Sequence, residues 1–183
     1  MKNYLIAFVL FSVTTTFGQT VDSVSVDSIT ESQMQLVRET YWAEIKPIGW
    51  VTDFEKLFTP AEVLSIDSML SVYEQETTNE IALVTLDTNY VTKAYFDEMA
   101  LVLAQKWQVG KKNKDNGILI AISRIHRRIR ICNGMSIQKV LTDDETKTII
   151  DKTIIPFFID GNYFEGTVKG IQRIMQELKQ ENK

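Results

Sequence analysis

The stretch GKKNKDNGILIAISRIHRRIRI, residues 110–131, decides the fold of this chain. It opens with a charged segment that ends in Asp-Asn-Gly, a typical turn sequence because Asn and Gly tolerate positive φ angles. The apolar run GILIAIS follows and predicts a strand that is buried on both faces. After a basic connection, Ile129 and Ile131 alternate with Arg128 and Arg130. We expect a second strand here, with the isoleucines buried and the arginines facing either solvent or an acidic partner.

Helix and strand patterns alternate on both sides of this stretch. Thr59 and Pro60 form a typical N-cap and first helical position, and Pro156 is expected to stop a later helix. In chain order we expect a strand at Trp50–Phe54, a helix from Pro60 to about Tyr73, a strand at Glu80–Leu86, a helix at Ala94–Trp107, two strands at Gly117–Ser123 and Arg127–Cys132, and helices at Asp143–Ile155 and Phe164 to about Glu181. This order predicts an α/β fold, a three-layer α/β/α sandwich around a small mixed sheet.

The N-terminal residues have the pattern of a secretory signal peptide. Lys2 precedes an apolar run at 4–13, which is too short to cross a bilayer as a helix, and small polar residues follow it. We expect a signal peptide at residues 1–18 that is removed on export; a retained anchor helix is the alternative. A linker with a possible strap segment is expected at residues 19–46, and one folded domain at residues 47–181.

The composition argues against several classes of protein. The 24 acidic residues outnumber the 20 Lys and Arg, and the net charge of −4 disfavours a general nucleic-acid binder. The single cysteine, Cys132, cannot form an internal disulfide, and its apolar neighbours predict an inert buried thiol. The single histidine, His126, falls in the basic connection, where we expect an exposed residue and not a general base. The eight glycines form no phosphate-binding loop.

Several side chains with oxygen ligands fall at one expected edge of the sheet. A strand, a crossover helix and a second strand usually make a parallel pair, so the strands that start at Glu80 and Gly117 should begin at the same end, and the next strand should return there. The edge then gathers Asn79, Glu80, Asp115, Asn116, Asn133, Thr142, Asp143 and Asp144. Such a set, without histidine, suits Ca²⁺ or Mg²⁺ and not Zn²⁺. Ordinary turn and N-cap roles are the alternative for each residue.

Segments of this chain resemble the TPM domain family, which is named for thylakoid lumen, photosystem II repair and membrane-tethered proteins. The resemblance covers about Trp50 to Leu178 and is carried by VTDF at 51–54, KDNG at 114–117, VLTDD at 140–144 and IIPFFIDGNYFEG at 154–166. It implies export, divalent-cation binding and, in some plant members, acid phosphatase activity. The acidic positions of the family fall here on Asp53, Asp115 and Asp143, with Asn116 beside them. Asp53 enters the set only through the resemblance, because a parallel first strand would leave it at the other end of the sheet.

The chain departs from the family pattern at Gly134-Met135-Ser136, where many members have Gly-Tyr-Gly followed by an acidic residue. The chain ends on LKQENK without a membrane span, so we expect a soluble protein after signal cleavage. Our leading hypothesis is an exported periplasmic or extracellular module that binds Ca²⁺, or Mg²⁺, and serves an envelope protein partner. One alternative is a metal-dependent acid phosphatase, with phosphate held by Lys111, Lys112 and Lys114. The other is an interaction domain that needs no ion.

Overall fold

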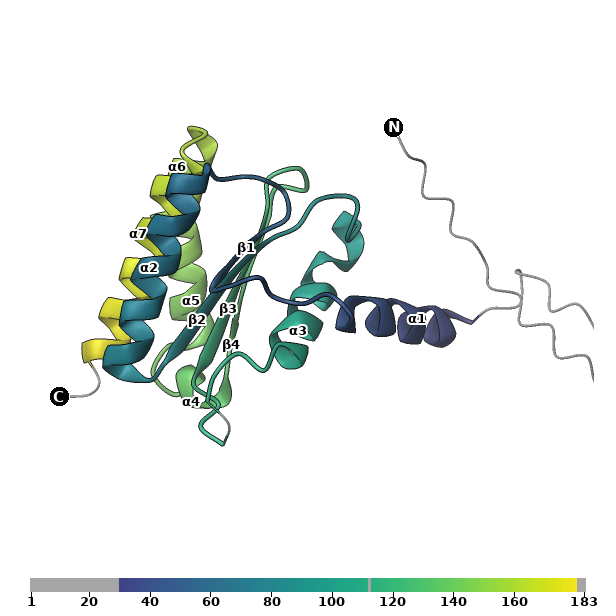
Figure 1. The fold of residues 1–183 in the computed structure, drawn as a ribbon, viewed down its shortest axis with the longest axis horizontal. Helices are drawn as coiled ribbons and strands as arrows, with labels where there is room; N and C mark the ends of the chain where they lie inside the picture. The colour runs from purple at the N-terminus through teal and green to yellow at the C-terminus, as the bar shows by residue number, and fades with distance from the viewer. Residues whose placement is uncertain (1–29, 112, 181–183) are drawn as a thin grey trace, which may run out of the picture.

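The computed structural model describes residues 30–111 and 113–180. The expected signal peptide and residues 19–29 of the expected linker lie outside these residues. The core is a four-stranded sheet with the strand order β1-β2-β3-β4, in which β1, β2 and β3 are parallel and β4 is antiparallel to β3. The strands are β1 (Val51–Asp53), β2 (Glu80–Thr85), β3 (Gly117–Ser123) and β4 (Arg128–Asn133). The predicted small mixed sheet is therefore confirmed (Figure 1).

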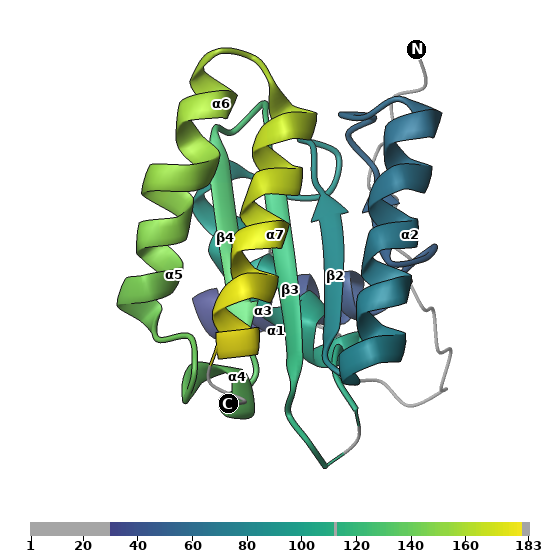
Figure 2. The same ribbon diagram turned by 90° about the vertical axis from the view of Figure 1, so that its left-hand side faces the viewer.

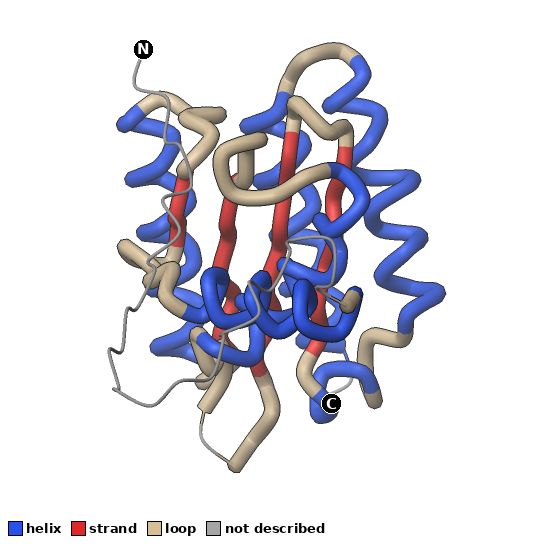
Figure 3. The backbone as a smooth tube through the Cα atoms, turned by 90° about the vertical axis from the view of Figure 1, so that its right-hand side faces the viewer, coloured by secondary structure: helices blue, strands red, loops and turns tan. Residues whose placement is uncertain are grey.

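Helices cover both faces of the sheet, which confirms the predicted α/β/α sandwich. One face is covered by α2 (Pro60–Thr77), α5 (Asp143–Ile149) and α7 (Tyr163–Gln180), as Figure 2 shows. On the other face lie α3 (Phe96–Lys106) and α1 (Glu31–Ala43), which cross the strands in Figure 3. All seven residues of β3 are buried, because its side chains alternate between the two helical layers.

The N-terminal part of the expected strap segment forms helix α1, which packs against α3. The helix begins at a capping box in which Thr30 and Gln33 satisfy each other's backbone N–H groups. Trp42, near its end, is buried and donates its indole N–H to the carbonyl oxygen of Tyr90 at 3.3 Å. This contact ties the helix to the loop that precedes α3. None of the helices in the described residues has the length and apolar character needed to cross a membrane.

The helix that begins at Asp143 does not stop at Pro156, contrary to the sequence prediction. After α5 the chain forms a π-helical turn at Ile150–Ile154 and then continues as α6 (Ile155–Ile159). A proline inside an α-helix lacks one N–H donor and clashes with the carbonyl of the preceding turn. The wider π turn gives the ring room at the start of a new helical segment. The chain reverses only at Gly161, whose φ of +80° favours glycine.

The connection between β3 and β4 is as tight as expected. The side chains of β4 alternate between the two faces as predicted, but Ile129 and Ile131 are half-buried and not buried. Ile129 and Ile131 pack against the core under α2 and α7. The arginines point to the opposite layer, where Arg128 forms an ion pair with Asp97 of α3. The prediction that the arginine face could cover an acidic partner is confirmed at this pair. The structure adds a short helix that the sequence did not predict, α4 (Met135–Gln138), directly after β4.

Candidate functional site

The strand register brings the expected loops to one edge of the sheet. Glu80 at the start of β2 pairs with Gly117 at the start of β3, and Asn133 at the end of β4 pairs with Ile118. The loop at 110–117 therefore meets the start of β2 and the end of β4, as the connectivity predicted. We call this place the loop edge.

Asn116 holds the loop edge together. Its side chain is buried, with 6% of its surface exposed, and it makes three hydrogen bonds, one within its own loop and two to the residues after α2. The amide oxygen accepts a bond of 2.8 Å from the backbone N–H of Lys111. The amide nitrogen donates to the Thr78 carbonyl at 2.7 Å and to the Asn79 side-chain oxygen at 3.2 Å. The amide of Asn116 thus clamps the 110–117 loop to the end of α2.

Charged groups reinforce this clamp through Lys111. The Lys111 ammonium lies 2.5 Å from Glu74 and 3.0 Å from Glu80. The hydrogen bonds that the Lys111 ammonium donates to Glu74 and Glu80 raise the pKa of Lys111, so it stays charged. Lys114 donates to the Thr78 hydroxyl at 3.2 Å. Lys112 lies outside the described residues.

Gly117 is required by the close approach of two backbone segments. A Cβ atom at this position would lie 1.8 Å from the carbonyl oxygen of Val109, which is far inside van der Waals contact. No side chain other than hydrogen fits there without moving the backbone. The glycine of the KDNG motif therefore positions the loop.

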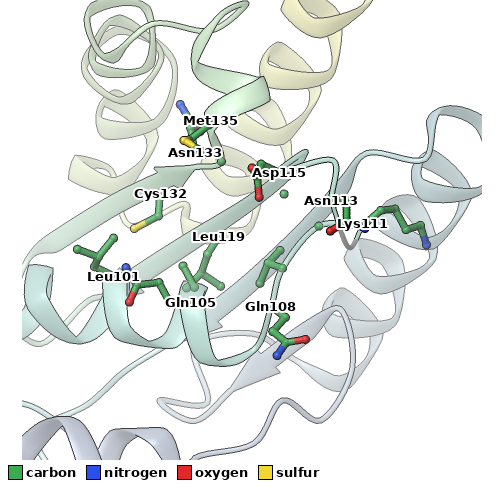
Figure 4. Close-up of a pocket in the computed structure, with 15 residues that line it drawn as sticks. Leu101, Gln105, Gln108, Lys111, Asn113, Asp115, Leu119, Cys132, Asn133 and Met135 are labelled. Atoms are coloured by element: carbon green, nitrogen blue, oxygen red, sulfur yellow. The ribbon is translucent and has the colours of Figure 1, made fainter.

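Asp115 is the one residue of the motif whose carboxylate is not used by the fold. Its backbone has a φ of +49°, and its carbonyl oxygen accepts a hydrogen bond of 3.1 Å from the Ser136 N–H. Within residues 30–111 and 113–180 we find no hydrogen bond or ion pair to its carboxylate. The side chain is exposed and lines a cleft of about 630 Å³ (Figure 4).

The cleft has an apolar floor and a polar rim. Leu119 of β3 and Cys132 of β4 form part of the floor, and Leu101 of α3 contributes to one wall. Burial raises the pKa of the Cys132 thiol and keeps it protonated, in agreement with the predicted inert thiol. Asn133 lines the same cleft and donates its amide to the Leu141 carbonyl and to the Thr146 hydroxyl.

The amide oxygen of Asn133 is buried without a partner in the described part of the chain. A buried acceptor of this kind normally has a hydrogen bond, a water molecule or an ion as its partner. Asp115 and Asn133 both line the cleft, but the Asn133 amide is bonded to Leu141 and Thr146 on the α5 side of the sheet, so the cleft itself offers the unused carboxylate and the neutral oxygens of its rim. Oxygen groups of these two types are ligands of Ca²⁺ and Mg²⁺.

Asp143 lies at the start of α5, shortly after the loop that Asn133 holds. Thr142 and Glu145 form the capping box of this helix, and Asp143 is exposed in its first turn. A carboxylate at this position favours the helix dipole. Asp143 therefore has a structural role that is independent of any ligand.

Asp53 lies at the opposite edge of the sheet, next to the end of β2. Its carboxylate accepts hydrogen bonds of 2.9 Å from the backbone N–H groups of Leu57 and Phe58, and one of 2.5 Å from the Thr85 hydroxyl. These bonds fix the turn after β1. The structure thus separates Asp53 from the other residues of the expected metal site.

Carboxylates are sparse at the loop edge. The described residues contain no group of three or more Asp, Glu, His or Cys side chains that could hold a metal ion. An ion beside Asp115 would therefore take most of its ligands from amide oxygens, backbone carbonyls and water.

His126 lies at the other edge and is half-buried instead of exposed, with Nε2 2.8 Å from the Val91 carbonyl oxygen.

The protein is a small α/β domain, defined by its sheet order, its two helical layers and its loop edge. The family model described as TPM domain matches residues 51–177, and the chain belongs to the TPM domain family. No curated protein sequence is significantly similar to it.

The solved structures that share the fold include the following three. The N-terminal domain of a P. gingivalis protein is 30% identical, with a TM-score of 0.65 over 72% of this chain and 83% of that one. The BA42 protein from Bizionia argentinensis is 23% identical, with a TM-score of 0.59 over 69% of this chain and 85% of that one. The N-terminal domain of cg2496 from Corynebacterium glutamicum is 13% identical, with a TM-score of 0.54 over 70% and 79%.

Proposed function

We propose that this TPM domain binds a divalent cation, with Ca²⁺ as the preferred ion, in the cleft at the loop edge. The bound ion orders the loops of this edge, which then bind a protein partner in the cell envelope. The observation that carries the proposal is the carboxylate of Asp115, which is exposed at the cleft and has no hydrogen bond or ion pair within the described residues. Asp115 supplies the charge, and neutral oxygens of the cleft rim complete the shell. Ca²⁺ accepts such mixed ligands together with backbone carbonyls and water.

The expected four ligands have unequal roles in this proposal. Asp115 is the direct ligand, whereas Asn116 acts as the clamp that holds its loop. Asp143 adds negative charge from the start of α5. Asp53 takes no part, because it lies at the other edge and its oxygens are hydrogen-bonded. With one carboxylate in contact, the affinity falls in the weak range of roughly 10⁻⁴ to 10⁻³ M, which extracellular calcium modules use.

The phosphatase alternative has less support. A phosphate at the loop edge would need cations to hold it. Lys111 is already paired with Glu74 and Glu80, which leaves Lys114 as the one described lysine of the three without an ion pair among the described residues. Breaking those pairs would leave two carboxylates facing the phosphate.

Export rests on the pattern of residues 1–18, and intact mass measurement of the protein recovered from its native compartment would test cleavage after Gly18.

Calcium titration followed by backbone amide chemical shifts tests the cation site. We expect saturable shifts in residues 113–117 and 133–136, lost in Asp115→Asn. Asp160→Asn is the matched control, because Asp160 is an exposed carboxylate in the α6–α7 turn. Identical titrations of the wild type and Asp115→Asn, or no saturable shift up to about 20 mM Ca²⁺, would contradict the proposal. Hydrolysis of p-nitrophenyl phosphate that disappears in Asp115→Asn would favour the phosphatase instead.

A further inference from the structure

A second concave site lies at the carboxyl end of β3, opposite the loop edge. Its volume is about 500 Å³, which is in the size range of small-molecule sites. One wall is the β3–β4 connection and the other is the turn between α6 and α7; both lie at the same end of the molecule (Figure 2). In open α/β sheets, ligands usually bind outside the carboxyl ends of the strands. We call this site the arginine pocket.

The arginine pocket is positively charged although the chain is acidic. Three arginines line it, namely Arg124, Arg127 and Arg128, and no acidic residue does so. Arg128 is paired with Asp97. Within the described ranges we find no ion pair for Arg124 or Arg127, and both side chains are exposed. Two guanidinium groups therefore remain free to bind an anion, for which their planar donor geometry suits carboxylate and phosphate.

Hydrogen bonds to its backbone hold the turn that carries these arginines in place. Glu55 is buried, with 8% of its surface exposed, and its carboxylate accepts hydrogen bonds of 2.8 Å from the backbone N–H groups of Arg124 and Ile125. On the other side of the turn, the Ser123 hydroxyl accepts a bond of 3.3 Å from the His126 N–H. The fold thus fixes the backbone from which both arginines extend. Such preorganisation reduces the entropy lost on binding.

The rest of the pocket is apolar. Ile129 of β4 and Ile155 and Phe158 of α6 line it, and the Phe158 ring packs against Tyr163 with 4.8 Å between the ring centroids. Ile159 stands at the mouth with 79% of its surface exposed. A ligand with a charged group and an apolar body would match both walls.

Protection of an exposed sheet edge is the alternative role for these charges. β4 is an edge strand, and charged side chains on edge strands prevent pairing with other chains. Arg128 and Arg130 have that position on β4. Arg124 and Arg127 do not, because they lie in the turn before the strand. Edge protection therefore leaves the two free guanidinium groups unexplained.

We propose that the arginine pocket binds a small organic anion, with its carboxylate or phosphate group on Arg124 and Arg127 and its apolar body against Ile129, Ile155 and Phe158. The site is separate from the loop edge and does not depend on the cation. The same chemistry could come from a free metabolite or from a lipid head group, and the size of the pocket favours a free molecule.

Octanoate and octyl phosphate are the probes for a test by amide chemical shifts on the whole protein. We expect saturable shifts in residues 123–129 and 155–163 with a dissociation constant below about 1 mM, and none with octylammonium. The double variant Arg124→Gln/Arg127→Gln should weaken binding by at least about tenfold. Arg173→Gln is the matched control, since Arg173 is an exposed arginine of α7 outside the pocket. Ile159→Ser should weaken octanoate binding without loss of fold.

Three results would overturn the proposal. The first is the absence of saturable shifts with either probe. The second is unchanged binding in the double variant, provided that its amide spectrum shows an intact fold. The third is binding to phosphatidylglycerol vesicles without binding of the soluble probes, which would assign the turn to a membrane surface. Loss of calcium binding in Asp115→Asn leaves these outcomes unaffected.

Discussion

Replacing Asn116 with alanine separates the clamp role of this residue from a role as ion ligand. Three hydrogen bonds are lost: from the Lys111 N–H, to the Thr78 carbonyl and to the Asn79 side chain. Each contributes about 1 kcal/mol net, so the free energy of unfolding should fall by about 3 kcal/mol. For a domain of this size that corresponds to a melting temperature lower by roughly 6 to 12 °C.

Equilibrium denaturation in guanidinium chloride, followed by circular dichroism, measures this loss. Gln105→Ala is the control, because Gln105 is an exposed amide on α3 for which the structure, over the residues it describes, shows no hydrogen bond; its effect should stay within about 0.5 kcal/mol. Hydrogen exchange at the Lys111 amide should become faster in Asn116→Ala. Stability of Asn116→Ala within about 0.5 kcal/mol of the wild type would refute the clamp.

Asn116→Asp sharpens the same test. The aspartate can still accept from the Lys111 N–H, but its second oxygen would face the Thr78 carbonyl, to which asparagine donates. We therefore expect it to be at least as unstable as the alanine variant at neutral pH, because a buried carboxylate without a donor is costly. Tighter calcium binding by a stable Asn116→Asp would instead identify position 116 as a ligand.

The remaining predictions concern backbone contact and titration. Gly117→Ala should cost at least about 3 kcal/mol in thermal unfolding because its Cβ would meet the Val109 carbonyl, whereas Gly161→Ala, with open space but a φ of +80°, should cost about 1 kcal/mol. Cys132 should resist a disulfide reagent in the native state. Burial raises the pKa of its thiol, so the thiol of the unfolded chain ionises first. Denaturation at rising pH should therefore show that the free energy of unfolding falls above about pH 8.5. Hydrogen bonds from Thr142 lower the pKa of Glu145, so the cap of α5 should weaken as the pH falls through that lowered value, which carboxyl chemical shifts can follow.

Much of the fold could be predicted because apolar runs and their periods reflect burial directly. The continuous apolar run at 117–123 forms the fully buried strand β3 as expected, and the alternation at 128–131 forms β4, which the structure places at the edge of the sheet. The π turn before Pro156 could not be predicted, since it depends on how the following helix packs. Glu55 gave no signal at all, because a single acidic residue in a turn looks like any solvated one until its two backbone partners arrive from the β3–β4 turn.

The sequence by itself determined the strands, the helix starts and, through chain direction, the edge of the sheet at which the Asp-Asn-Gly loop meets the end of β4. Only the tertiary structure decided which oxygen atoms at that edge remain free. Asn116 and Asp115 are neighbours with similar side chains, yet the amide finds its partners 5, 37 and 38 residues away and the carboxylate finds none among the described residues. Hydrogen bonds between distant segments engage side-chain oxygens that could otherwise bind an ion. Packing in three dimensions determines which of these hydrogen bonds form.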